Sequence, residues 1–434
     1  MRKSAVILFV LIILLASYPT PQQTKAGGDW SAWLFTPGEN PGMLTSGQPL
    51  LVRVYEDGAA EEHAFSVPEG ASLQFPRFAF TDNGNWIAYC VTVSDPFHIE
   101  LHVVDLSASA DPMAEVYNVT LPFVYELETA ANCLYPSFNN HFDDTGDIKL
   151  ALSVQNNIRG TETPDSVPPL WEILIFNLTT GEIEQRLTSD SSAVAETMIF
   201  PRPEVSPPPM PEILHFDGDV VFRMMPQGGI YGLPETSAYV WDTGDGTITP
   251  YPQYDSLYSD TIQIIDAAGQ LLETEVVRAD VDGTFPITDE VDATGTFTPY
   301  NVIVYSNDSG GQYPIFTWPG GMNDVTFISN GRHIAIHAPS YGMIALARNG
   351  EQTGLPVNPN AGRLVGAPGG YAFVDMDISM MTTRLMYHYF TPEEQRTVEA
   401  KILWENTEDQ GWTIVWSEPM PVVADLAPFP EVTP

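Results

Sequence analysis

Short apolar runs alternate with polar turns along most of the chain, at the spacing expected for β-strands. The clearest unit begins at Phe75 and reads FPRFAFTDNG, NWIAYCVTV, IELHVVDLS and AEVYNVTL. Each run is rich in β-branched and aromatic residues, and turn formers such as Asn83-Gly84 separate the runs. Four strands in up-and-down order make one blade of a β-propeller, so residues 75–123 are predicted to form one blade.

The same unit recurs farther along the chain. Its opening returns as YPSF at Tyr135 and as FPRP at Phe200, in steps of 60 and 65 residues. The segment FTDNGNWIAY returns as FISNGRHIAI, with a second Asn-Gly pair at 330–331. Asn-Gly between apolar runs is a strong hairpin signal. Because repeated units can build one long ring, the 434 residues need not be divided into several domains.

The repeats predict an all-β fold, a single β-propeller of about seven four-stranded blades, with six or eight blades as the alternatives. Helix signals are sparse, and residues 392–400 are the only short candidate. The propeller domain is expected over residues 29–430. Its blades are predicted at 29–68, 75–123, 134–189, 199–253, 256–321, 322–358 and 362–418.

The two ends of the repeat array predict how the ring closes. The first blade offers only three strands, WSAWLFTP, LLVRVYED and EEHAFSV, and lacks an innermost one. The last blade offers four, LVGAPGGYAFVDMD, RLMYHYF, EAKILWEN and WTIVWSE, and an apolar run at 422–429 still follows. We expect residues 422–429 to pair beside the first blade and cover its open edge. A loose tail is the alternative.

These motifs also carry a family resemblance. The segments FTDNGNWIAY and FISNGRHIAI, followed by a strand that ends in an aspartate or asparagine and then a Thr-Gly turn, resemble the TolB-like and WD-repeat-like propeller families. The resemblance is closest over residues 75–189, weaker over 199–253 and 322–417, and poorest over 254–321. It implies a propeller fold and names no activity.

The N-terminus has the pattern of an export signal. Arg2 and Lys3 precede an unbroken apolar run at 5–16, and Ala26 is a small residue suited to cleavage. Twelve apolar residues are fewer than the roughly 20 that span a bilayer. We therefore predict a signal peptide at 1–26, a linker at 27–28, a secreted or extracytoplasmic protein and no stable membrane span after cleavage. An uncleaved anchor is the alternative.

Export bears on the two cysteines, Cys90 and Cys133. Disulfides persist outside the cytosol. Cys90 ends a predicted strand and Cys133 opens the next blade, so the two residues lie on neighbouring blades. The sequence leaves two outcomes open, a Cys90–Cys133 disulfide and two buried thiols.

Charge excludes some partners. The chain has 56 acidic and 17 basic residues, a formal net charge of −39. Removal of residues 1–26 takes away three bases and no acid, which leaves −42. Such a surface repels nucleic acid and anionic lipid and suits cationic partners, metal ions or high salt. Simple solubility of an exported protein is the alternative explanation.

No common catalytic motif is present. The sequence lacks G-x-S-x-G, H-E-x-x-H, C-x-x-C and G-x-x-x-x-G-K. No cofactor is predicted apart from a weak calcium candidate, in which Asp280, Asp282 and Asp289 occupy three ligand positions of a calcium loop. Arg278 stands at the first position, where a carboxylate is needed. An acidic turn is the alternative.

Two histidine pairs fall on predicted strands. His98, Glu100 and His102 share one strand face, and about 13 Å separates the two histidines. They are therefore too far apart to share a metal ion, although either can pair with Glu100. His333 and His337 have the same spacing. For both pairs we expect a solvated strand face.

Two arginines are candidate ligand-binding residues. Arg77 and Arg202 occupy the same position in FPRF and FPRP, on strands expected to border the central channel. Guanidinium groups there can bind an anion. Structural salt bridges are the alternative.

By analogy with other propellers, we expect a binding or scaffold module for a protein, peptide or glycan ligand at the channel mouth, rather than an enzyme. The alternative is an extracellular glycan-active enzyme of sialidase or lyase type. Residues 306–313, SNDSGGQY, resemble the Asp-box turn of sialidase propellers, but the box does not recur and Tyr313 replaces its usual tryptophan, so a plain hairpin turn is favoured.

Overall fold

A computed structural model gives the fold of the chain. It describes residues 30–37, 49–65, 67, 71–73, 78–107, 111–139, 147–156, 169–197, 210–225, 238–250, 260–265, 271–279, 300–306, 312–319, 324–338, 342–347, 351–357, 363–377, 380, 382–390, 398–407 and 411–418. The predicted signal peptide at 1–26 lies outside these residues.

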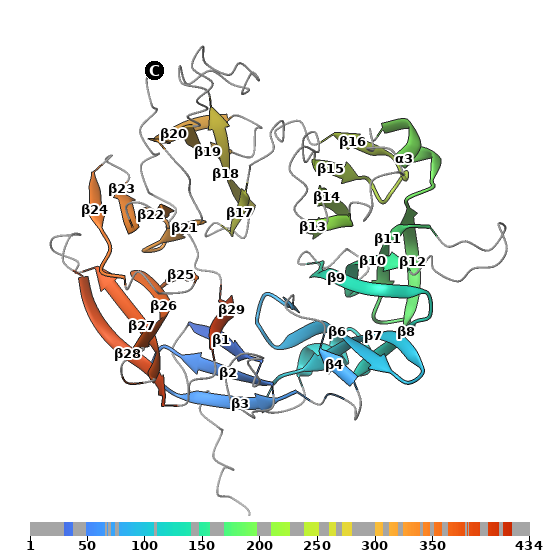
Figure 1. Ribbon diagram of the computed structural model, residues 1–434, viewed down its shortest axis with the longest axis horizontal. Helices are drawn as coiled ribbons and strands as arrows, with labels where there is room; N and C mark the ends of the chain where they lie inside the picture. The colour runs from blue at the N-terminus through green and yellow to red at the C-terminus, as the bar shows by residue number, and fades with distance from the viewer. Residues whose placement is uncertain are drawn as a thin grey trace, which may run out of the picture.

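The described strands form seven antiparallel sheets that follow one another around a ring, and we number them as blades 1 to 7 (Figure 1). Blade 1 contains β29 (Thr413–Ser417), β1 (Ser31–Thr36), β2 (Leu50–Tyr55) and β3 (Ala60–Ala64). Blade 2 contains β4 (Ala71–Leu73), β5 (Ala79–Phe80), β6 (Trp86–Ser94), β7 (Phe97–Asp105) and β8 (Phe123–Leu127). Blade 3 contains β9 (Ala130–Phe138), β10 (Lys149–Asn156), β11 (Trp171–Asn177) and β12 (Glu182–Thr188).

The other four sheets have the same plan. Blade 4 contains β13 (Met210–Asp217), β14 (Asp219–Met225), β15 (Ala238–Trp241) and β16 (Ile248–Pro250). Blade 5 contains β17 (Asp260–Ile265), β18 (Leu271–Ala279), β19 (Tyr300–Ser306) and β20 (Gln312–Pro319). Blade 6 contains β21 (Asp324–Ile328), β22 (His333–Ala338), β23 (Gly342–Ala347) and β24 (Gln352–Gly354). Blade 7 contains β25 (Leu364–Ala367), β26 (Gly370–Asp377), β27 (Thr382–Phe390) and β28 (Val398–Asn406).

Burial follows the position of a strand within its blade. All six residues of β1 are buried, whereas β3, at the edge of the same sheet, alternates between exposed and half-buried residues. A central strand is covered on both faces by the neighbouring blades, so it needs a continuous apolar sequence. An edge strand has one face in water and keeps the period-two pattern.

One predicted strand of blade 2 is wrong. The run AEVYNVTL was expected to be the fourth strand, but the structure places the short helix α2 (Pro112–Val116) there and the fourth strand at β8. Pro112 is the first helical residue, a position that suits proline because its missing N–H has no partner in the first turn. A second short helix, α3 (Ser192–Thr197), precedes blade 4.

The first described strand of blade 4 is β13, and the FPRP motif at Phe200, where this blade was expected to begin, lies outside the described residues. At the predicted helix 392–400, residues 398–400 belong to β28 and the rest is not described.

The ring closes through a different C-terminal strand from the one predicted. β29 pairs antiparallel with β1, and the Glu418 N–H donates to the Ser31 carbonyl at 2.9 Å. The run LVGAPGGYAFVDMD, expected to be one strand, is the hairpin of β25 and β26, in which Ala367 pairs with Gly370 across Pro368-Gly369. Blade 7 is therefore complete without β29, which becomes the missing strand of blade 1. Residues 422–429 lie outside the described part of the chain.

Close packing secures this closure against blade 2. Trp33 Nε1 on β1 donates to the Gly84 carbonyl at 2.7 Å. Gly84 has φ +65°, and a Cβ built there would lie 2.5 Å from the Trp416 ring of β29. The turn that joins β5 to β6 therefore needs glycine for its backbone conformation and for room.

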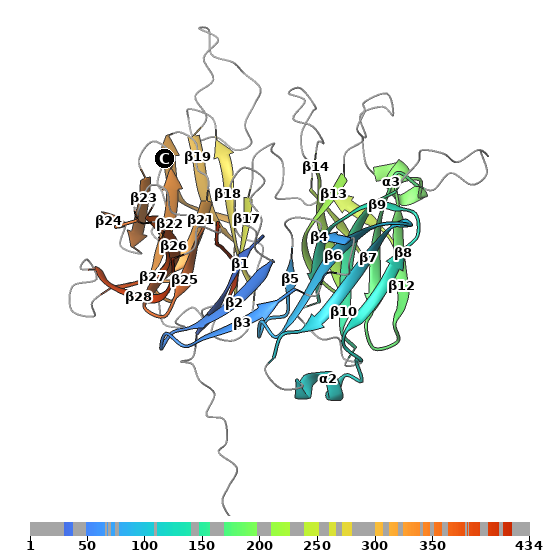
Figure 2. The ribbon, with the colours of Figure 1, turned by 60° about the horizontal axis from the view of Figure 1, so that its bottom comes forward.

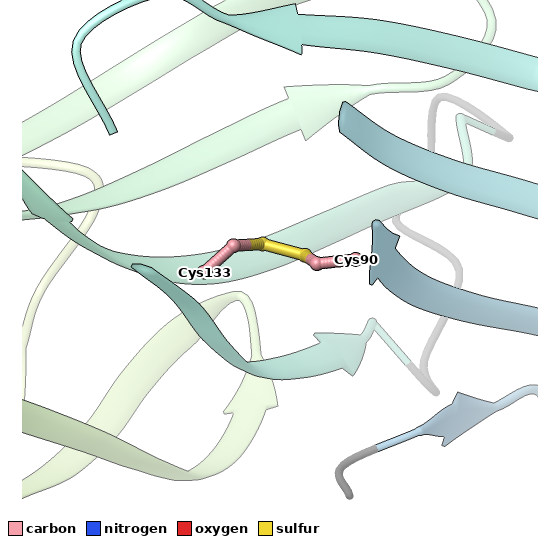
Figure 3. The surroundings of a disulfide bond; sticks show 2 residues. All are labelled: Cys90 and Cys133. Atoms are coloured by element: carbon pink, nitrogen blue, oxygen red, sulfur yellow. A yellow bond between two sulfur atoms is a disulfide. The ribbon is translucent and has the colours of Figure 1, made fainter. Parts of the chain in front are cut away.

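A disulfide links blades 2 and 3 (Figure 3). It joins Cys90 of β6 to Cys133 of β9, with 6.0 Å between the Cα atoms, within the usual range for this bond. Both residues are buried in the core shared by the two blades. Of the two outcomes that the sequence left open, the structure contains the bonded one.

In the part of the chain that the structure describes, no helix is long and apolar enough to cross a bilayer.

The disulfide is expected to stabilise the fold measurably. It closes a loop of 43 residues, so its loss is expected to lower the free energy of unfolding by about 4 kcal/mol on the chain-entropy model. Chemical denaturation of the oxidised protein and of a Cys90→Ala/Cys133→Ala variant measures the difference. Equal denaturation midpoints would contradict the prediction.

Gly84 and Gly218 form a matched pair for testing the closure. Both have positive φ, but nothing lies within 4 Å of a Cβ built at Gly218. Gly218→Ala is expected to cost about 1 kcal/mol, and Gly84→Ala roughly 2–4 kcal/mol because the Trp416 ring must also move. Thermal unfolding of the two variants gives the comparison, and equal losses would argue against the packing of Trp416 on this turn.

Candidate functional site

Most of the sequence-predicted site residues lie outside the described part of the chain. Arg77 and Arg202, and the calcium candidates Asp280, Asp282 and Asp289, are among them. The anion site and the calcium site therefore stay predictions.

Of the second histidine pair, His333 does not match its prediction, and the side chain of His337 lies outside the described part of the structure. His333 is buried and stacks on the Phe390 ring of blade 7, with centroids 4.5 Å apart, rather than lying on a solvated face. Burial lowers the pKa of His333 to about 4, so the ring is neutral at neutral pH. Its neighbours are aromatic, and it serves as part of the seam between blades 6 and 7.

The connection from β7 to β8 builds a pocket at one end of blade 2, where α2 projects beyond the sheet (Figure 2). The chain leaves β7 at Asp105 and enters α2 after Asp111. The helix ends at Val116, and Asn118, with a φ of +52°, then turns the chain back, so that the Val119 N–H donates to the Ala114 carbonyl at 2.9 Å. A left-handed asparagine is a common way to end a helix.

Two carboxylates are fixed at the base of this connection. The Asp111 N–H donates to Asp105 Oδ2 at 3.1 Å, and the Ser107 N–H donates to Asp105 Oδ1 at 2.8 Å. Asp111 Oδ2 accepts from Trp86 Nε1 at 3.1 Å and from Asn85 Nδ2 at 3.2 Å. Asp111 is buried, so these donors supply the hydrogen bonds that water would otherwise make.

The same network reaches blade 1. Arg53 of β2 is buried; its Nη1 donates to Asn85 Oδ1 at 2.8 Å and its Nη2 to the Asn83 carbonyl at 3.0 Å. Its guanidinium lies within 6 Å of the ring centroids of Trp33, Tyr55 and Trp416. The base of the pocket is thus held by the blade that closes the ring.

We call this cavity the acidic pocket. Its volume is about 760 Å³, and it lies between α2 and the adjoining ends of β7 and β8. All of its charged side chains are acidic, and half of its lining is apolar or aliphatic. The lining residues are Val104, Asp105, Asp111, Ala114, Glu115, Asn118, Val119, Thr120, Leu121 and Pro122.

The acidic pocket combines the carboxylates of Asp105, Asp111 and Glu115 with apolar side chains. Within the described residues no group of three or more metal-ligating side chains is placed to hold a metal ion. What the pocket can do is attract a cationic group and pack its alkyl part against the apolar wall.

Sequence reasoning missed Asp105 and Asp111 as site residues. The strand that ends at Asp105 was recognised as part of the repeat, and residues 108–112 were interpreted as a turn. The pair Asp111-Pro112 is a helix-start signal that could have indicated α2. The contact of Trp86 with Asp111 has no signature in the sequence.

Substitution of Asp111 is expected to lower the free energy of unfolding more than substitution of Glu115, which also lines the pocket. Asp111→Ala leaves the Trp86 and Asn85 donors without an acceptor, so we expect a loss of roughly 3 kcal/mol in the free energy of unfolding. Asp111→Asn keeps an acceptor oxygen and is expected to lose less than half of that, and Glu115→Ala, at an exposed position, almost nothing. Denaturant titration followed by tryptophan fluorescence ranks the three variants; an alanine variant as stable as Glu115→Ala would contradict the prediction.

Comparison with known proteins places the fold only. No protein-family model and no curated protein sequence matches the chain. Among solved structures, the β-propeller domain of the Trilobed protease from Pyrococcus furiosus is 12% identical, with 88% of this chain and 94% of that chain covered and a TM-score of 0.45.

Two further structures are similar. TolB from Acinetobacter baumannii is 14% identical, with 73% of this chain and 61% of that chain covered and a TM-score of 0.37. A prolyl endopeptidase is 10% identical, with 85% and 47% covered and a TM-score of 0.48. The match thus spans less than two thirds of the length of these two proteins. The seven described sheets show on their own that the chain has a β-propeller fold, which it shares with TolB-like propellers.

Proposed function

We propose that this chain is an exported, non-enzymatic binding module for a protein or peptide ligand, and that a lysine or arginine side chain of the ligand enters the acidic pocket. The observation that carries the proposal is the lining of the pocket, in which every charged side chain is a carboxylate. An alkyl stem with a cationic end matches a cavity whose lining is half apolar and whose charged side chains are all acidic.

The rigidity of the carboxylates supports the proposal. Asp105 and Asp111 are held by backbone and side-chain donors, so little side-chain entropy is lost when a ligand binds. Glu115 is exposed and Asn118 lies beside the opening of the pocket, where both can meet a ligand first.

The charge of the whole chain favours the same class of partner. A formal charge of −39 produces a field that attracts cationic ligands and raises their association rate at low salt. Export is supported by the basic and apolar N-terminal sequence and by the disulfide, a bond that persists outside the cytosol.

Matched peptides test the binding proposal. The probe is a fluorescein-labelled Gly/Ser decapeptide with two central lysines, compared with the same peptide carrying norleucine or glutamate at those positions. Fluorescence polarisation is expected to show binding of the lysine peptide alone, weakening as NaCl is raised from 50 to 300 mM. Glu115→Gln is expected to raise its Kd about two- to fivefold.

The control variant is Glu62→Gln, which removes an exposed carboxylate from β3 in blade 1 and changes the net charge by the same amount. An equal effect of the two variants, or equal binding of the lysine and norleucine peptides, would refute the pocket as the binding site. N-terminal sequencing of the protein recovered outside a host cell that expresses residues 1–434 tests export, with a start at Gly27 as the expected result.

A further inference from the structure

The hairpin between β6 and β7 lies at the other end of blade 2 from the acidic pocket. Strand β7 runs from Phe97, next to the turn, to Asp105, in the pocket, a distance of about 26 Å at strand rise. The tip of this hairpin carries Phe97, whose side chain is one of the large apolar groups exposed in the described residues.

One carboxylate holds two histidines on this hairpin. Glu100 Oε1 lies 3.1 Å from His98 Nε2, and Glu100 Oε2 lies 2.8 Å from His102 Nε2. All three side chains are largely covered, with exposed fractions between 10% and 20%. Alternation along β7 brings them onto one face, and the Glu100 carboxylate bridges a gap that the two rings cannot close directly.

The two histidines differ in the protons that they need. His98 Nδ1 lies 2.9 Å from the Pro96 carbonyl, and its Nε2 faces the Glu100 carboxylate. A carbonyl oxygen and a carboxylate only accept hydrogen bonds, so both contacts require an N–H, and a ring with two N–H groups is an imidazolium. His102 needs a proton only on Nε2 for its contact with Glu100, and its ring stacks on Tyr89 at 5.5 Å.

The surroundings favour the charged ring. The hydrogen bond to the Pro96 carbonyl raises the pKa of His98 above its ordinary value, and the Glu100 hydrogen bond and the Glu126 charge act in the same direction. Glu126 is the β8 partner of Glu100 in the sheet. Although partial burial works the other way, hydrogen bonds from His102 and His98 lower the pKa of Glu100, which keeps its charge.

The other elements packed on this face add no positive charge. The β6 partners of His102, Glu100 and His98 are Tyr89, Val91 and Val93, and burial raises the pKa of Tyr89 to about 12. Val124 of β8 is paired with His102. From the seam with blade 1, the aromatic rings of Phe65 and Phe78 pack on Tyr89. The other charged groups of the hairpin are acidic: Asp95, exposed in the turn itself, and Asp105, at the far end of β7.

We propose that His98 acts as a proton-operated clasp on the β6–β7 hairpin. As an imidazolium, His98 holds the Pro96 carbonyl of the turn and the Glu100 carboxylate of the strand together. When the ring loses a proton, the hairpin tip is released. A neutral ring has one N–H and one lone pair, so one of its two contacts becomes a contact between two acceptors. The tip that is freed carries the exposed Phe97 and lies away from the acidic pocket, so the clasp works whether or not the pocket binds a ligand.

The raised pKa of His98 determines how the stability contributed by the clasp depends on pH. Because the folded-state pKa of His98 is raised above the ordinary 6.5, its stabilising contribution is complete below that pH. The contribution is lost as pH rises through the folded-state pKa. The clasp is therefore closed in mildly acidic surroundings and opens toward alkaline pH.

Histidine NMR on the full chain tests the protonation state. Long-range ¹H–¹⁵N spectra of the eight histidines are expected to show both His98 ring nitrogens protonated at pH 6.5, with a midpoint above that value. Glu100→Gln is expected to lower the midpoint, and Glu126→Gln, which removes a charge but no hydrogen bond to the ring, to lower it less. A His98 midpoint at or below 6.5 would overturn the proposal.

Hydrogen exchange tests the release of the tip. After correction for intrinsic rates, amides at 94–99 are expected to lose protection as pH rises through the His98 midpoint, while those of the β8–β9 hairpin, residues 127–130, do not. His98→Gln carries no titrating ring and is expected to abolish the pH dependence. An unchanged pH profile in that variant would show that His98 does not control the hairpin.

Discussion

The antiparallel pairing of β29 with β1 places the first and last described strands in one sheet, and the other blades depend on that pairing for a closed ring. Without β29, the inner edge of β1 would expose unpaired backbone groups beside blades 2 and 7. With it, Trp416 covers the Gly84 turn of blade 2. On the other side, Trp30, which is buried next to β1, donates from Nε1 to the Gly366 carbonyl of blade 7 at 3.1 Å. Blade 1 is therefore joined to both neighbours.

Arg53 of blade 1 connects the closing sheet to the base of the acidic pocket. A buried guanidinium is tolerated only when its donors are satisfied, and Ser31, Asn83 and Asn85 provide the acceptors. Asn85 in turn donates to Asp111. The hydrogen bonds that hold the base of the pocket thus run from Arg53 through Asn85 to Asp111, and they begin in blade 1, where β29 closes the ring. Closure of the ring and the geometry of the pocket are therefore structurally connected.

Blade 2 presents different chemistry at its two ends. At one end, carboxylates held by N–H donors line a cavity; at the other, one carboxylate bridges two imidazoles at the base of a hairpin. Strand β7 connects the two, since Asp105 ends it and His98 lies near its start. A protein with few bases uses backbone and aromatic donors to hold its acids, which leaves the surface field negative.

The sequence by itself determined the local elements. Alternating apolar positions predicted the strands and the all-β propeller, and Asn-Gly predicted the turns at 83–84 and 330–331 because glycine and asparagine adopt the backbone angles that tight turns need. With only two cysteines in the chain, one intramolecular pairing was available, and the structure contains it.

Only the tertiary structure decided which strand closes the ring and where the acids meet. The run LVGAPGGYAFVDMD has a composition that fits either one strand or a hairpin. Because it forms a hairpin, blade 7 is complete without β29, and β29 rather than residues 422–429 pairs with β1 to close the ring. Likewise the Asp111 carboxylate is held in place by hydrogen bonds from Trp86 and Asn85, about 25 residues away. The His98 ring contacts the Pro96 carbonyl and the Glu100 carboxylate at the same time. Strand pairing and buried hydrogen bonds join residues distant in sequence, and a local pattern of apolar and polar positions holds no information about which distant partner each residue meets.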